Sequence, residues 1–432
     1  MKTFEKAGWG FGSIGTQVVT FSQALFLLYF FTVILGLQPA LAGLLIFSGK
    51  IFDAVLSPFI GRMSDGTHSR WGRRRPFLLV GALISALGIA ALFNIRASQP
   101  ALLLLMLLVI SVGYSCFNIP YLAMSAEMTE SPTERTSLMA WRVAFVAVGQ
   151  LLATALLPLV VKAGGSGPTG YANLGFVAAV LILLTMPVAF IATARAPSAA
   201  ASEVSYSLAT LWNAVRGNRP FALLISAKVL QLVGLAATSA AMLFFFKNVI
   251  GGGESRLALW GVAVNAVSIL SMSAWPVLGK RYGKVTIYTL SLLGFAVAGF
   301  SWLFANSDTG VVGILVRAVL SGFFVGGLLL MQQSLIPDTM TVDFRHTGLR
   351  REGIFAGAYS FVEKGASAVG PLIVGLLFQF MGFNPKAAGA DTDTTAVYVA
   401  IGVVTPLLYL LSAWPVGRMQ RALDDSAARD AT

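Results

Sequence analysis

The sequence predicts an all-α membrane protein with twelve transmembrane helices arranged as two pseudo-symmetric six-helix bundles. Three observations lead to this prediction. Only 11% of the 432 residues are charged, whereas about 25% are charged in an average soluble chain. Twelve apolar runs follow one another, and each is close to the roughly 20 residues that a helix needs to cross a bilayer. The runs do not alternate apolar and polar residues as the strands of a membrane β-barrel do.

The expected spans are separated by short polar breaks. They are 9–35, 39–61, 76–96, 100–126, 138–161, 171–194, 220–249, 257–279, 285–305, 310–336, 354–380 and 396–416. The first run is long, contains Gln17 and Gln23, and lacks a small-residue cleavage site. We therefore expect it to be a span and not a cleaved signal peptide.

A polar stretch rich in Ala and Ser, at 195–219, separates six runs from six. We expect an N-terminal bundle at 1–194, a central cytoplasmic loop at 195–219, and a C-terminal bundle with a short cytoplasmic tail at 220–432. A repeat supports this division, because "SRWGRRR" (69–75) and "KRYGKVT" (280–286) occupy the same place in each half. Parallel six-helix repeats are a known transporter plan.

The net charge of +12 fits a membrane protein better than a nucleic-acid-binding one. If the N-terminus is inside, most Lys and Arg residues fall in cytoplasmic segments, as the positive-inside rule requires. We expect a multi-pass protein of the cytoplasmic (inner) membrane with both termini cytoplasmic, whose partner is the lipid bilayer and not nucleic acid. The chain has neither an HExxH nor a Walker-type motif, so we expect no enzyme, no catalytic residues and no metal site.

The loop "GRMSDGTHSRWGRRRPF" (61–77) combines one carboxylate with several arginines. Asp65 can pair with Arg70, Arg73 or Arg74. The loop resembles the signature loop of the major facilitator superfamily, in which such pairs latch one conformation. The alternative is an arginine cluster that only anchors the loop inside, but this would not explain Asp65 or the glycines.

Two other charged segments, 127–135 and 343–352, follow the fourth and tenth spans and so occupy equivalent places in the two halves. We expect them to act as matched gate elements. The candidate inner-gate pairs come from Glu127, Arg135, Asp343 and Arg351. Solvated loops without a gating role are the alternative, because exposed ion pairs contribute little.

Five stretches carry a more specific resemblance. They are "WGFGSIG", "LLYFFTVILGL", "KIFDAVLSPFIGRMSDGTHSRWGRRRPF", "YSCFNIPYLAMSAEMTESPTERTSLMAWR" and "TVDFRHTGLRREGIFAGAYSFVEKGASAVG". Together they resemble the glycoside-pentoside-hexuronide family of cation symporters. The resemblance implies alternating access and the import of a sugar or sugar conjugate driven by sodium, lithium or protons. We expect a monomer that takes a small sugar-type substrate.

Ionisable residues within spans mark functional sites by default, because burying them is costly. The resemblance implies two acidic cation ligands four residues apart in the second span. In this sequence the first of these positions is Asp53 and the second is Ser57. The resemblance also places Ser115, in the fourth span, near the cation. Lys50 shares a helix face with Asp53 and can pair with it; the alternative is a self-neutralising pair that only locks the helix. With one acid missing, we expect proton coupling through Asp53 first, sodium coupling second and uncoupled transport third, and no resident cofactor.

The substrate candidates are partly polar and partly basic. The resemblance places Gln17 and Asn118 at acidic sugar-binding positions, while Arg142 and Lys364 match the family's basic positions, and Tyr359 offers a ring near Lys364. Basic residues within spans (Lys50, Arg142, Lys228, Arg317 and Lys364) outnumber the acidic ones (Asp53 and Glu363). Because arginine grips carboxylates, we hypothesise an acidic substrate such as a hexuronide. Alternatively, Lys228 and Arg317 snorkel to the interface and leave a neutral-sugar site.

Other functions stay open from the sequence. A carrier of lysolipids or other amphiphiles would share the fold, and a non-transporting sensor or a membrane enzyme would come from another class. Gly322 and Gly326 form a small-xxx-small pattern that predicts close helix packing.

Overall fold

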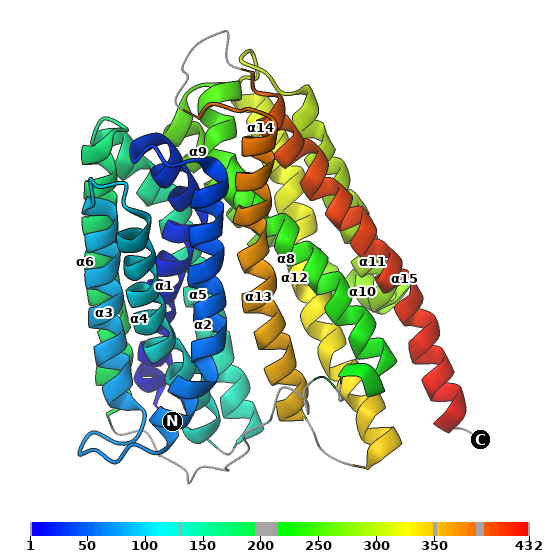
Figure 1. The fold of residues 1–432 in the computed structure, drawn as a ribbon. Helices are drawn as coiled ribbons and strands as arrows, with labels where there is room; N and C mark the ends of the chain where they lie inside the picture. Colours follow the sequence, from blue (N-terminus) through cyan, green and yellow to red (C-terminus); the bar gives the residue numbers. More distant parts are fainter. Residues whose placement is uncertain are drawn as a thin grey trace. The chain divides into compact units, whose positions relative to one another are not determined.

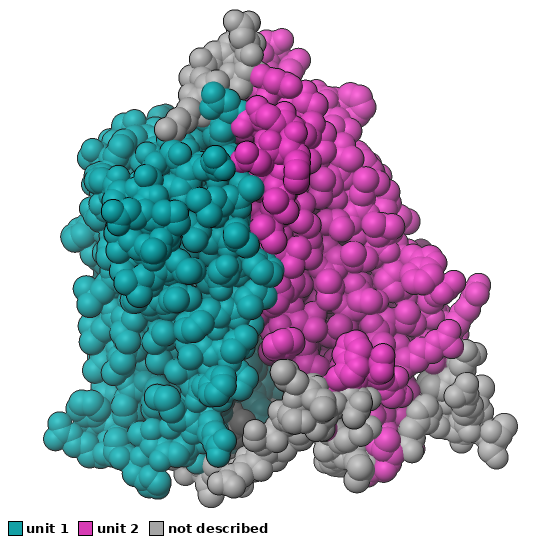
Figure 2. All heavy atoms as spheres, viewed as in Figure 1, with its two compact units in different colours: residues 1–203, 252–262, 384–389 teal, residues 204–251, 263–383, 390–432 magenta. Residues whose placement is uncertain are grey.

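The computed structural model describes residues 2–129, 131–194, 212, 215–348, 352–385 and 393–430. The regular elements in these ranges are all helical, which confirms the predicted all-α class (Figure 1). Among the described residues, eleven helices are long and apolar enough to cross a membrane, or twelve if one bent pair counts as a single span. The structure divides into two compact units, drawn in different colours in Figure 2. Most of the expected central loop, 195–219, lies outside the described residues.

Unit 1 comprises Met1–Glu203, Gly252–Val262 and Asn384–Gly389. Its helices are α1 (Thr3–Tyr29) with the π-helical turn η1 (Phe30–Ile34), α2 (Pro39–Asp65), α3 (Arg75–Asn94), α4 (Pro100–Glu127), α5 (Pro132–Ala163), α6 (Pro168–Ala192) and the first part of α9 (Gly253–Ser271).

Unit 2 comprises Val204–Gly251, Ala263–Phe383 and Ala390–Thr432. Its helices are α8 (Arg219–Phe245) with η2 (Phe246–Ile250), the rest of α9, α10 (Trp275–Tyr282), α11 (Lys284–Phe300) with η3 (Ser301–Phe304), α12 (Val311–Thr347), α13 (Glu352–Phe380), α14 (Thr395–Val399), η4 (Ala400–Val404) and α15 (Thr405–Asp430).

The helices of each unit pack in the same order. In unit 1, α1 packs on α5 and α6, α3 packs on α4 and α6, and α2 packs on α4. In unit 2, α8 packs on α13 and α15, α11 packs on α12 and α15, and α10 packs on α12. Each unit is therefore built on one six-helix plan, as expected for an internal repeat.

Proline marks the beginning of many of these helices. Pro39, Pro100, Pro132, Pro168 and Pro220 each occupy the first or second helical position. Proline is favoured there because its fixed φ suits a helix and its missing N–H would have had no intrahelical partner. The expected starts at 39, 100 and 220 fall within one residue of the observed ones, whereas α5 and α6 begin six and three residues before the expected 138 and 171.

The expected span 257–279 is bent. Helices α9 and α10 meet at an angle of 51° across a short break, which falls before Pro276. Because Pro276 lacks an N–H, it cannot bond to the carbonyl of Met272, four residues earlier. The indole of Trp275 instead donates to the Phe323 carbonyl of α12, at 3.1 Å. The span predicted over 257–279 is thus bent, and its two helices begin four residues earlier and end three residues later than expected.

The two segments expected as charged loops are shorter than predicted. Helix α4 continues through Glu127 and α5 begins at Pro132, so only 128–131 connects them. The side chain of Ser131 accepts from the backbone N–H of Glu134, which caps α5. Helix α12 continues through Thr347 and ends at Gly348, whose φ of 67° is left-handed. Arg351 lies outside the described residues.

Small residues bring helix backbones into contact in both units. A Cβ added at Gly81 of α3 would come 2.4 Å from the backbone nitrogen of Phe117 in α4. In unit 2, a Cβ added at Gly322 would come 2.5 Å from the Val264 carbonyl oxygen, and one at Gly326 would come 2.1 Å from Ser271 Oγ. The close packing predicted for Gly322 and Gly326 is confirmed.

Candidate functional site

The first polar cluster lies between α2 and α4 of unit 1. Ser115 Oγ donates to Asp53 Oδ1. Ser57 Oγ donates to the backbone carbonyl of Asp53 at 2.7 Å and lies 3.4 Å from Ser115 Oγ. Ser115 is buried, and Asp53, Ser57 and Lys50 are half-buried. The structure thus brings Asp53, Ser57 and Ser115 into one carboxylate–hydroxyl cluster, and Lys50 lies one turn before Asp53 on α2.

Close packing near Gly49 holds this cluster together. A Cβ on Gly49 would lie 3.0 Å from Leu107 Cβ of α4, and Ser111 Oγ donates to the Gly49 carbonyl at 3.0 Å. Since Ser111 and Ser115 are four residues apart, they lie on the same face of α4. One serine fixes the helix pair and the other reaches the carboxylate.

The cluster supplies oxygen atoms but a single carboxylate. Among the described residues, no three His, Cys, Asp or Glu side chains are placed together to hold a metal ion. A carboxylate with hydroxyl neighbours can bind a proton or contribute to an oxygen site for a small cation. The arrangement therefore suits a monovalent coupling ion.

The substrate candidates of unit 1 lie on three helices. Gln17 is on α1, Asn118 on α4 and Arg142 on α5, and all three are half-buried. A Cβ on Gly10 would lie 3.1 Å from the backbone nitrogen of Arg142, and one on Gly149 would lie 3.0 Å from Gln17 Cβ. These glycines bring α1 and α5 together at the candidates, although no hydrogen bond joins Gln17, Asn118 and Arg142 in the described chain.

The Arg142 guanidinium has a hydrogen-bond donor without an acceptor among the described residues. Its Nε is buried and lacks a hydrogen-bond partner among the described residues. A buried donor of this kind is costly unless something accepts from it. Arg142 Nε can thus donate to an acceptor other than the described residues.

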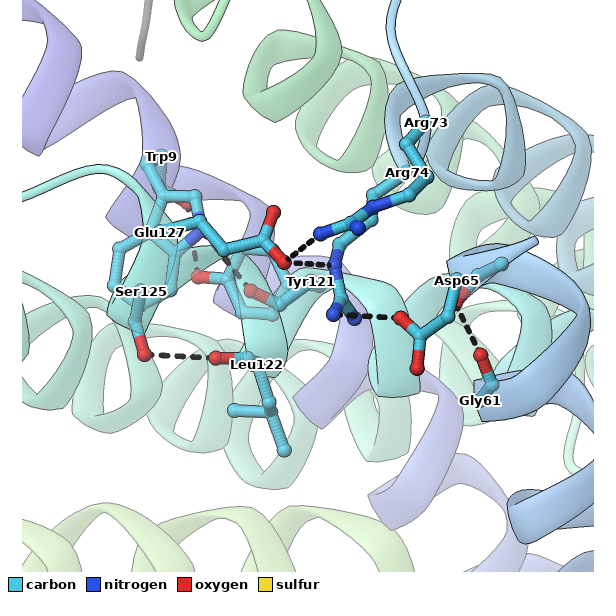
Figure 3. A network of polar contacts seen from close by, with 10 residues as sticks. Trp9, Gly61, Asp65, Arg73, Arg74, Tyr121, Leu122, Ser125 and Glu127 are labelled. Atoms are coloured by element: carbon cyan, nitrogen blue, oxygen red, sulfur yellow. Dashed lines mark hydrogen bonds and ion pairs between the residues drawn. The ribbon is translucent and has the colours of Figure 1, made fainter. Parts of the chain in front are cut away.

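Tyr121 of α4 has a structural role. Its ring stacks on Trp9 with 4.6 Å between centroids. Its hydroxyl donates to the Trp9 carbonyl at 2.9 Å and lies 2.7 Å from Ser13 Oγ, while the Trp9 indole donates to the Tyr121 carbonyl at 3.2 Å (Figure 3). These contacts join α1 to α4.

A second polar cluster lies inside unit 2, around Lys228 of α8. Lys228 Nζ donates to Gln332 Oε1 of α12 at 2.8 Å, lies 4.0 Å from Glu363 Oε1 of α13, and is 5.4 Å from the centre of the Tyr359 ring. Lys228 is 6% exposed. The alternative in which Lys228 snorkels to the interface is therefore wrong.

Two further donors in the Lys228 cluster are buried. Gln332 Nε2 and the Tyr359 hydroxyl have no hydrogen-bond partner among the described residues. Lys364, the other candidate of α13, is half-buried and follows Glu363 directly. The cluster can therefore donate to an acceptor-rich group. Gln332 was not among the residues expected from sequence, and its only signal is a polar pair, "QQ", within an apolar run.

Arg317 differs from Lys228. Its Nε and Nη2 donate to the Ser301 carbonyl at 3.2 and 3.1 Å, and its Nη1 donates to the Gly313 carbonyl at 3.0 Å. The guanidinium also lies over the Trp302 ring, 5.4 Å from its centre. Its contacts are with backbone carbonyls, so Arg317 stabilises the fold of unit 2 where α11 ends.

The candidate gate of unit 1 is a chain of ion pairs (Figure 3). Arg73 Nη2 and Arg74 Nε contact the same oxygen, Glu127 Oε1, at 2.5 and 2.7 Å. Arg74 Nη2 also contacts Asp65 Oδ1 at 2.7 Å. Of the three arginines that could pair with Asp65, Arg74 is the one that does. Arg74 therefore links the end of α2 to the end of α4.

The other gate candidates are not part of this chain of ion pairs. Arg70 stacks on Trp71, with 5.0 Å from its guanidinium to the ring centre. Arg135 Nη2 donates to the Thr129 carbonyl at 3.2 Å. Asp343 is buried near the end of α12. Glu127 therefore binds loop arginines and not Arg135.

Unit 2 repeats this geometry with different residues. Gly72 and Gly283, at matching places in the two repeat motifs, have positive φ angles of 94° and 87°, which glycine adopts without strain. The basic residue after each glycine reaches an acid on the fourth span of its unit, with the bent pair α9–α10 counted as one span. Lys284 Nζ contacts Asp338 Oδ2 of α12 at 2.7 Å, as Arg73 contacts Glu127 of α4. The sequence indicated Asp343 instead of Asp338.

Comparisons with known proteins agree with this plan. Residues 8–420 match the model of a family described as "MFS/sugar transport protein". The isoprimeverose transporter of Lactiplantibacillus pentosus is 27% identical over 88% of this chain and 81% of its own length. The glucuronide carrier protein homolog of Escherichia coli is 26% identical over 95% of this chain and 90% of its own.

A solved structure supports the same fold. The crystal structure of the nucleoside transporter NupG superposes with a TM-score of 0.66 over 98% of this chain and 99% of its own, at 13% identity. At this identity the likeness concerns the fold alone, and that fold is the major facilitator fold. The expected fold is confirmed.

Proposed function

Because this chain belongs to the MFS/sugar transport protein family, in which the proteins are transporters and not enzymes, we propose that it is a secondary transporter that imports a glycoside, pentoside or hexuronide. The observation that carries the proposal is the pairing of a carboxylate–hydroxyl cluster in unit 1 with a buried donor cluster in unit 2. Burying polar and charged groups in a membrane protein costs free energy, so their presence there indicates a functional site.

Proton coupling through Asp53 is the first part of the proposal. The Asp53–Ser57–Ser115 cluster has one carboxylate and two hydroxyls. A proton needs a single exchangeable site, whereas a sodium ion needs several oxygens and gains from a second negative charge. Ser57 supplies an oxygen without charge, so the cluster favours a proton over sodium.

An acidic sugar is the second part. Lys228 is buried, and its nearest carboxylate oxygen, on Glu363, is 4.0 Å away. Burying an ammonium group is costly unless it is paired. Lys228, Gln332 Nε2 and the Tyr359 hydroxyl together provide donors that a carboxylate could accept from. The glucuronide carrier homolog fits this class, while the isoprimeverose transporter points to a neutral glycoside, so both must be tested.

Alternating access is the third part. Substrate and proton can drive import only if they bind one conformation better than another. Ion pairs such as Arg73–Glu127 and Lys284–Asp338 can bias such an equilibrium when they form in one conformation alone. We propose that they do so during transport.

Uptake into proteoliposomes tests the proposal. The panel contains a hexuronide, a neutral glycoside and a pentoside, each under an imposed proton or sodium gradient. We expect a proton gradient to drive accumulation, and Asp53→Asn to abolish accumulation while retaining exchange of substrate across the membrane. The matched control is Asp308→Asn, which alters an exposed loop acid. Accumulation by Asp53→Asn at the parent's level would refute the coupling role, and no flux of any sugar would refute the function.

A further inference from the structure

A cavity of about 210 Å³ lies at one end of unit 1. It is formed by the 70–75 segment, the end of α4 and the residues after α6. Its walls include Arg70, Trp71, Arg73, Arg75 and Glu127. The proposed transport function uses the Arg73–Arg74–Glu127 ion pairs but not the cavity beside them.

Positive charge exceeds negative charge around this cavity. Arginines at 70, 73, 74 and 75 line it, against the single carboxylate of Glu127, and Asp65 reaches Arg74 from outside. Arg75 donates to the Phe190 carbonyl at 2.8 Å and to the Trp71 carbonyl at 3.1 Å, so carbonyls hold it in place without neutralising it. The cavity therefore attracts an anion.

Arg70 is the cation most available to a ligand. Its side chain is exposed and stacks on Trp71, and it makes no ion pair within the described part of the chain. The guanidinium presents a planar set of donors that matches a phosphate group. The guanidinium carbon lies over the Trp71 ring, 5.0 Å from its centre, and both residues line the cavity.

The cavity lies at the level where spans end. Helix α2 ends at Asp65, α3 begins at Arg75 and α6 ends at Ala192. Trp71 is 42% exposed and packs edge-on against Phe190, with 5.7 Å between ring centroids. Ile191, next in sequence, is 63% exposed. An exposed tryptophan beside an exposed aliphatic residue is typical of the membrane–water interface.

We propose that this cavity binds the phosphate headgroup of an anionic phospholipid, with Arg70 and Arg73 as the donors and with the acyl chains lying along the end of α6. Basic pockets at this depth suit lipid headgroups. A bound phosphate competes with Glu127 for Arg73 and Arg74, so it weakens the ion pairs that join the 66–74 loop to α4. The lipid composition of the membrane thereby changes the stability of the candidate gate.

Native mass spectrometry of the purified full chain tests this site. The detergent-solubilised protein is incubated with phosphatidylglycerol or, separately, with phosphatidylcholine, and retained lipid is counted. We expect tighter retention of phosphatidylglycerol, and we expect Arg70→Gln to weaken it about fivefold, since each basic residue near an anionic surface is worth about 1 kcal/mol. Arg70→Lys, which keeps the charge but loses the planar group, should fall between the two.

The repeat provides a matched control. Arg281 lies over the ring of Tyr282, 5.2 Å from its centre, in the same motif position as Arg70 over Trp71. Arg281→Gln should leave retention unchanged, and equal losses in the two variants would overturn the site in favour of general attraction. Displacement of the lipid by millimolar inorganic phosphate would overturn the lipid as the source. Monodisperse elution and an unchanged melting temperature establish that each variant is folded.

Discussion

Removing the charge of Glu127 should destabilise unit 1 more than the corresponding change destabilises unit 2. Arg73 and Arg74 both contact Glu127 Oε1, and the side chains of Arg73, Arg74 and Glu127 are 17%, 11% and 13% exposed. Hydrogen bonds to charged groups contribute about 1.5–3 kcal/mol each, and the amide of Glu127→Gln keeps one acceptor oxygen. We therefore expect the free energy of unfolding to fall by about 2 kcal/mol.

The matched change is Asp338→Asn. Lys284 and Asp338 form a pair of similar length, 2.7 Å, but their side chains are 42% and 38% exposed. Exposed pairs contribute about 0.2–1 kcal/mol, so the loss should stay below about 1 kcal/mol.

Equilibrium unfolding in mixed micelles, followed by circular dichroism, measures both losses. Added salt should reduce the effect of Asp338→Asn further, because exposed pairs are screened, and should change that of Glu127→Gln less. If Asp338→Asn destabilises the protein as much as Glu127→Gln does, or if Glu127→Gln has no effect, burial does not determine the strength of these pairs.

Two further predictions concern Lys228 and Gly81. Lys228→Gln should lower hexuronide uptake about tenfold, the equivalent of about 1.4 kcal/mol, and leave neutral-glycoside uptake unchanged. The control is Lys280→Gln, which alters an exposed lysine. Equal loss of uptake of both sugars, or any loss of uptake in the control, would contradict an anion-specific role. Gly81→Ala should lower the free energy of unfolding by about 1–3 kcal/mol, because its Cβ would meet backbone. Gly417→Ala, which meets no atom within 4 Å, should not be destabilising, and equal losses would contradict the packing argument.

The positions of the helices could be predicted because they depend on local signals. Apolar runs of span length and prolines at helix starts are both visible in the sequence. The bend at Pro276 had a local signal too, but the contacts of Trp275 with Phe323 of α12 join residues 48 positions apart. The extension of α12 through Thr347 could not be predicted, since charged residues at the end of a span are equally compatible with a loop.

The candidate sites were predictable only in part, because tertiary packing selects partners. Asp53 and Ser115 are 62 residues apart. Their proximity was expected from the family resemblance and not from their spacing in the sequence. The partner of Glu127 could not be read from nearby Arg135, because the 66–74 loop folds back to deliver Arg73 and Arg74. The burial of Lys228 likewise depends on Gln332 and Tyr359, which come from two other helices.

The two repeat motifs show how the same backbone geometry can support ion pairs of different strength. Gly72 and Gly283 both have positive φ angles, and the residue after each reaches an acid on the fourth span of its unit. In unit 1 the acid is shared by two arginines and is largely shielded from water, whereas in unit 2 one lysine pairs with one exposed acid. An exposed pair breaks and reforms at little cost, but a shielded one needs a competing group to release it. A headgroup phosphate at Arg73 would be such a group, so unit 1 is the half of the protein in which we expect lipid to control the gate.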